Sequence, residues 1–123
     1  EELQWARIMG SGHAAAGLAI VFMQKLCTLV HEFQPAYRAG VLGEGALPYF
    51  RERIARRIAR LVRALELNHL DRLDGVAGLR LLQGDVLACG TLEELAITSE
   101  RAHELNHTLT DALEHVVLVR GEE

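Results

Sequence analysis

The pattern of apolar positions begins with an unusually long uncharged segment. Residues 8–24 contain no Lys, Arg, Asp or Glu and are framed by Arg7 and Lys25. A helix that is apolar on every side is buried by neighbouring helices, so we expect this segment to lie at the centre of the fold. The pattern predicts a first helix from about residue 3 to residue 34, ended by Pro35. A membrane-spanning helix needs about 20 predominantly apolar residues, and this segment is shorter and rich in glycine, so we expect no membrane span.

The second helix is predicted over residues 47–73, with Asp74-Gly75 as its stop. Apolar residues recur there at the three-and-four spacing of one buried face. At about 100° per residue, a row of arginines falls on the opposite side. This row consists of Arg53, Arg56, Arg60 and Arg63.

The remaining third of the chain is also predicted to be mainly helical. Residues 76–83 are typical of a short helix and Gly84-Asp85 of a turn, while the apolar run 86–89 fits either a strand or a helix. Thr91 and Glu94 form a capping-box pattern that begins a last helix reaching about Val119. The expected fold is therefore an all-α antiparallel bundle of about four helices, the third short, in a single domain spanning residues 1–123.

Charge is unevenly distributed along the chain. The net charge is −4, yet residues 51–63 are strongly basic and the segment from Thr91 to the end is strongly acidic. Because opposite blocks attract one another, we expect them to pair within one chain or between two, which predicts a homodimer or an acidic protein partner. The acidic balance argues against nucleic acid as the partner. The two cysteines lack metal-type spacing, which favours reduced thiols and a cytoplasmic location.

Two short strings suggest a metal site. Glu66-x-x-His69 and Glu104-x-x-His107 each place a carboxylate and an imidazole on one helix face, as in di-iron helical bundles. His103-Glu104-x-x-His107 also has the spacing of the zinc-protease helix. However, the last helix is expected to turn Glu104 and His107 toward solvent, which disfavours a protease.

An antiparallel hairpin with its turn near residue 41 would bring His13 level with His69. His69 is expected on the apolar stripe of the second helix, so a divalent metal ion held by His13, Glu66, His69 and His103 is one hypothesis. The alternative is that His69 is a helix-end residue bonded to a backbone carbonyl. His31 and His115 are interpreted as helix-face residues without a paired function.

Three strings together resemble sensor histidine kinases. His13-Ala-Ala-Ala-Gly-Leu18-Ala-Ile-Val is similar to the phospho-acceptor region of their dimerisation and phosphotransfer domain, and Arg57-Ile-Ala-Arg-Leu-Val to its returning helix. Thr108-Leu-Thr-Asp111-Ala-Leu-Glu-His115 is similar to the first ATP-site helix of those kinases. The resemblance implies that His13 is a phospho-acceptor. His107 and Asp111 replace the usual Glu and Asn, and no glycine-rich nucleotide lid follows, so autonomous kinase activity is not expected.

The sequence thus favours a signalling or interaction bundle over an enzyme. The first hypothesis is a dimerisation or histidine-phosphotransfer relative without kinase activity of its own. The second is a metal-binding bundle that uses the two Glu-x-x-His motifs, and the third is a purely structural protein that binds a partner.

Overall fold

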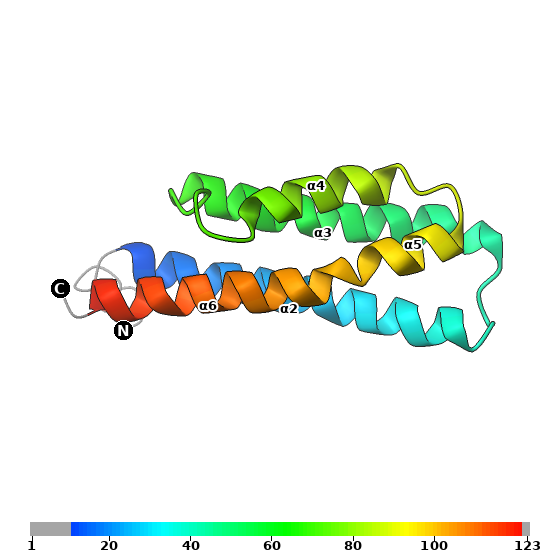
Figure 1. The fold of residues 1–123 in the computed structure, drawn as a ribbon, viewed down its shortest axis with the longest axis horizontal. Helices are drawn as coiled ribbons and strands as arrows, with labels where there is room; N and C mark the ends of the chain where they lie inside the picture. The colour runs from blue at the N-terminus through cyan, green and yellow to red at the C-terminus, as the bar shows by residue number, and fades with distance from the viewer. Residues whose placement is uncertain (1–10, 122–123) are drawn as a thin grey trace.

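The computed structural model describes the backbone of residues 11–121 and the side chains of residues 14–116, and this part of the chain is all-α, as the sequence predicts. No strand occurs within residues 11–121. The elements in order are α2 (Ser11–Arg38), the 3-10 turn η1 (Glu44–Ala46), α3 (Leu47–Leu67), α4 (Val76–Leu87), α5 (Leu92–Ser99) and α6 (Arg101–Gly121). Helices α5 and α6 follow one another around Glu100 and together form the fourth rod of an antiparallel bundle (Figure 1).

The helices pack in a closed order around the bundle. Helix α3 returns along α2, α4 returns along α3, and the α5–α6 rod runs back along α2 while also touching α4 (Figure 1). The ring centroids of Phe33 and Phe50 lie 5.0 Å apart near the α2–α3 turn, and Arg57 donates a hydrogen bond to the carbonyl oxygen of Lys25 further along. Both contacts agree with the register expected from a turn near residue 41.

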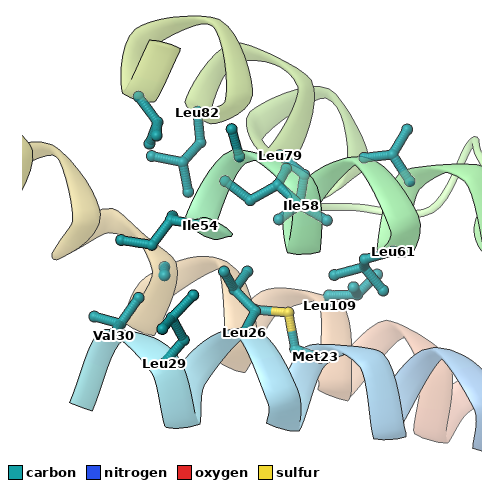
Figure 2. Packing of buried hydrophobic residues seen from close by; sticks show 14 of the residues in the cluster. Met23, Leu26, Leu29, Val30, Ile54, Ile58, Leu61, Leu79, Leu82 and Leu109 are labelled. Carbon is teal, nitrogen blue, oxygen red and sulfur yellow. The ribbon is translucent and has the colours of Figure 1, made fainter. Parts of the chain in front are cut away.

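One core lies between these four rods. Met23 and Leu26 of α2 meet Ile58 of α3, Leu79 of α4 and Leu109 of α6, and all five are at most 1% exposed (Figure 2). Burying each such side chain contributes about 1.5–3 kcal/mol relative to leaving it in water. The apolar stripe predicted for the second helix is therefore confirmed, and an equivalent stripe of α6 that includes Leu109 and Leu113 also faces the core.

The expected end of the first helix was wrong. Pro35 lies inside α2, and the helix continues to Arg38. The stop is Gly40, whose φ of 72° is left-handed. The backbone N–H of Gly40 donates to Tyr37 and that of Val41 to Ala36, the paired bonds of a Schellman motif. The expected start near residue 3 lies outside the described residues.

The second helix also ends elsewhere than predicted, at Leu67 instead of residue 73. His69 adopts the left-handed conformation, with φ 59°, and its N–H donates to Glu66 while Leu70 N–H donates to Leu65. These bonds again form a Schellman motif, with a histidine at the position that glycine usually occupies. Gly75 is left-handed too (φ 97°), but it precedes α4 instead of ending α3.

Three further boundaries were predicted incorrectly or only in part. Helix α4 runs through Gly84-Asp85 to Leu87, so there is no turn there, and residues 86–89 form no strand. The last helical segment is divided at Glu100, which the sequence did not indicate. Its start is confirmed, because Thr91 Oγ1 accepts a hydrogen bond from Glu94 N–H. Glu94 reaches back to the N–H of Gly90 and not to that of Thr91.

Candidate interaction surface

Helix α2 has an open apolar face, which corrects the expectation that neighbouring helices surround it. Helices α3, α5 and α6 cover one side. On the other side Leu18 is 47% and Val21 45% exposed, and Ala14 and Gly17 are exposed beside them. The outer face of α2 from residue 14 to residue 21 thus carries no polar side chain.

The length and composition of α2 alone do not decide whether it meets lipid. Its segment Ala14–Arg38 is long and apolar enough to cross a membrane, with a hydropathy of 1.5, and 39% of that window is buried inside the protein. The central helix of a soluble bundle has the same properties, so this finding is weak evidence for a membrane span. The surroundings of the open face are more informative.

A groove runs between α2 and α3 beside this open face. It has a volume of about 610 Å³ and is lined by Leu18, Phe22, Arg56, Ala59, Arg60, Arg63, Ala64, Leu67 and Asn68. Its floor consists of apolar side chains, among them Leu67, which is 63% exposed. A smaller recess shares Phe22 and Arg60 and continues toward Lys25 and Glu32. We call these two hollows the α2–α3 groove.

Arginines form the rim of the groove. Arg56, Arg60 and Arg63 project from α3 on the side opposite its buried residues, which confirms the orientation expected from the sequence. Among residues 14–116, the ion pairs involve Arg80 and Arg101 only, so no described carboxylate forms an ion pair with the three rim arginines. The fourth residue of the row, Arg53, lies over the ring of Tyr49 at 5.0 Å in a cation–π contact.

A face of opposite charge lies on the α5–α6 rod. Glu93, Ile97, Glu100 and Glu104 are all exposed, and their spacings of four, three and four place them on one side of a helix. The side is continuous across the break because Glu100 keeps right-handed helical dihedrals (φ −60°, ψ −28°). Ile97 is 63% exposed in the middle of these carboxylates. We call this set the acidic face, and none of its carboxylates forms an ion pair with a described residue.

The described members of the expected metal cluster, Glu66, His69 and His103, are not grouped together. Glu66 lies 3.7 Å from Arg80, and the same arginine lies 3.9 Å from Asp71. His69 is exposed at the end of α3 and is not on the apolar stripe, because the helix has already ended. In the part of the chain with described side chains, no three His, Cys, Asp or Glu residues are grouped so as to hold a metal ion.

The other histidines are distributed as follows. His103 faces His31 across the α2–α6 contact, with ring centroids 4.8 Å apart, so His31 is paired where the sequence suggested no partner. His107 and Glu104 are exposed, as expected for the polar side of the last helix, and His115 is exposed further along α6. His13 belongs to the backbone of α2, but its side chain lies outside the described residues.

The strings that resemble a histidine kinase occupy helices of the bundle. The returning-helix string lies in α3, antiparallel to α2, and residues 108–115 lie in α6, which packs along α2. Comparison of the chain with family models, curated proteins and solved structures finds no match. The functional interpretation therefore depends on the geometry and chemistry described above.

One contact and two exposed side chains were not anticipated. The pairing of His31 with His103 and the exposure of Leu18 and Leu67 depend on which helix packs against which side of α2. The uncharged residues 8–24 were the one signal in the sequence, and they were interpreted as a fully buried helix. Leu67 is exposed because it lies two residues after the buried Leu65, about 200° around α3 and on the same side as Arg60 and Arg63.

Proposed function

We propose that the protein is a helical interaction module that associates with a second copy of itself through the α2–α3 groove. The observation that carries this proposal is the arginine rim, which forms no ion pair with a described carboxylate, around an apolar floor, on a chain that also exposes an acidic face. Exposed apolar groups rimmed by polar ones are typical of protein–protein contact sites.

The acidic face of the second copy is the occupant that fits best. The negative carboxylates of Glu93, Glu100 and Glu104 are opposite in charge to Arg56, Arg60 and Arg63. Ile97, which lies among these carboxylates, supplies an apolar side chain for the groove floor. Two identical contacts related by a two-fold axis would close the pair, as in most homodimers. Desolvated charge pairs at such a contact fix its register and orientation more than they add affinity.

The test is the association state of purified protein by light scattering and sedimentation at low and high salt. We expect a dimer at low salt that dissociates as salt rises, because the screening length falls from about 10 Å at 0.1 M to about 3 Å at 1 M. Arg60→Glu and Glu100→Arg should each weaken the dimer by about tenfold or more, equivalent to about 1.4 kcal/mol. Mixing the two variants should restore association. Arg72→Glu, an exposed arginine outside the groove, is the matched control.

Other occupants of the groove give different results. A chain that stays monomeric at every salt concentration contradicts self-association. If that monomer binds an acidic amphipathic peptide, the occupant is another protein, and if it sediments with vesicles of anionic lipid, the face binds a membrane surface. Failure of the Arg60→Glu and Glu100→Arg mixture to associate, with both variants folded, would show that these two residues do not meet.

A further inference from the structure

His31 and His103 form a cross-helix pair that the interaction surface does not use. His31 lies on α2 and His103 in the first turn of α6, and their ring centroids are 4.8 Å apart with ring planes inclined by 50°. His31 is exposed and His103 half-buried, so both rings are reachable from solvent. Neither imidazole has a hydrogen-bond partner among the described residues.

The separation of the rings suits two ligands of one metal ion. Metal–nitrogen bonds of about 2.0–2.1 Å, with ligand angles of about 90–110°, place two imidazole centroids about 4.5–5.3 Å apart. The observed distance lies within this interval. Rings in simple aromatic contact also lie about 4.5–7 Å apart, and metal titration distinguishes the two arrangements.

We propose that His31 and His103 bind a borderline-soft divalent transition metal ion, such as Zn²⁺, Ni²⁺ or Cu²⁺, and so clamp α2 to α6. Imidazole nitrogen is a preferred ligand of these ions and not of Mg²⁺ or Ca²⁺. No third His, Cys, Asp or Glu with described side chain completes the group, so water occupies the remaining coordination positions. Cys27 lies one helical turn before His31, but it does not complete a group of three ligands with the two histidines.

Two features prepare the site for a cation. The register of α2 against the α5–α6 rod is fixed next to the pair, because buried Gln34 donates hydrogen bonds to Ala96 O at 2.6 Å and Ser99 Oγ at 2.7 Å. Because the backbones of α2 and the α5–α6 rod are already fixed here, less conformational entropy is lost when an ion binds. The charge nearby is also favourable, since Glu32 follows His31 and Glu100 precedes His103 by three residues, while Arg101 is engaged by Asp85 at 2.6 Å.

The experiment titrates the full chain with Zn²⁺, Ni²⁺ or Cu²⁺ and follows binding by calorimetry and by thermal unfolding. We expect one ion per chain, with Cu²⁺ tighter than Ni²⁺ or Zn²⁺, and a higher melting temperature because the ion binds only the folded state. Loss of one of two linked ligands should weaken binding by about a hundredfold, so His31→Ala and His103→Ala should each remove most of the affinity. Mg²⁺ should give no shift.

The controls separate this pair from other histidines. His107 lies one turn after His103 on α6, and a pair at that spacing can also chelate a metal ion. We expect His107→Ala and His115→Ala to bind as the unchanged chain does. Retained binding in His31→Ala together with lost binding in His107→Ala would overturn the proposal, and so would an unchanged chain that binds none of the three ions. Because His31, His107 and His115 are exposed and His103 is only partly buried, these variants are expected to fold.

Discussion

Replacement of Gln34 by leucine tests what holds the divided α5–α6 rod against α2. Gln34 and Ser99 are buried polar residues, 4% and 0% exposed. The side-chain amide of Gln34 bonds both the carbonyl of Ala96 and the hydroxyl of Ser99, and Ser99 Oγ also bonds that carbonyl at 3.2 Å. Carbonyls in the last turn of a helix lack intrahelical partners, so Gln34 supplies the partner that lets α5 end at Ser99 inside the protein.

The magnitude follows from the bonds that are lost. Leucine nearly conserves the volume of glutamine, so the cavity cost is small. Two buried hydrogen bonds disappear at about 1 kcal/mol each, and the Ala96 carbonyl keeps only the longer bond from Ser99. We expect Gln34→Leu to lower the free energy of unfolding by about 2 kcal/mol, which corresponds to about 5–10 °C in melting temperature for a domain of this size.

Ser99→Ala should cost less, about 1 kcal/mol, because Gln34 still bonds the Ala96 carbonyl. The two substitutions share a bond, so their combined effect should be smaller than the sum by about 0.5–1 kcal/mol. The assay is denaturant unfolding of both single variants and the double variant, with Gln24→Leu as control because Gln24 is exposed on the same helix. A neutral Gln34→Leu, or strictly additive costs, would refute the account of the break.

Two smaller predictions come from backbone strain and from burial. His69→Gly should raise the free energy of unfolding by about 1 kcal/mol in denaturant melts. The reason is that His69 holds a left-handed φ of 59°, which costs a residue other than glycine about 1–2 kcal/mol. A less stable variant would show that the imidazole makes a stabilising contact. Burial raises the pKa of the Cys27 thiol above its ordinary value of 9.0, so alkylation of this thiol near pH 9 should be slower in the folded chain than in the unfolded chain. Because folding opposes ionisation of the thiol, the free energy of unfolding should fall as the pH rises above that value. Equal alkylation rates in the folded and unfolded chain would contradict the second prediction.

The core could be predicted from the sequence because it depends on local periodicity. Ile58 and Leu109 lie at the centres of their stripes and are fully buried, and Arg56 and Arg60 lie opposite as expected. The helix ends were less predictable. Pro35 lies inside α2, and the helix ends instead at the left-handed Gly40 five residues later. Helix α3 ends at a left-handed histidine, a position that sequence rules assign mainly to glycine.

The break at Glu100 and the His31–His103 pair depend on tertiary contacts. Neither Ser99 nor Glu100 is a helix breaker, and the polar group that accommodates the break comes from Gln34, more than sixty residues earlier in the chain. Periodicity cannot show which helix faces α2 at a given level. For that reason the sequence suggested His13, His69 and His103 as neighbours, whereas α6 in fact brings His103 to His31.

The open face of α2 and the arginine rim have to be explained together. The helix needs one buried side for the core, and a solvent-exposed side tolerates charged residues at little cost, yet residues 14–21 expose only Ala14, Gly17, Leu18 and Val21. Placing this face in the interior of a membrane would also draw in Arg56 and Arg60, which line the same groove, at about 2.5–3.5 kcal/mol for each arginine. A protein surface that is apolar in the middle and acidic at its edges satisfies both features. The chain exposes such a surface around Ile97, and this is why we favour a second copy as the occupant of the groove.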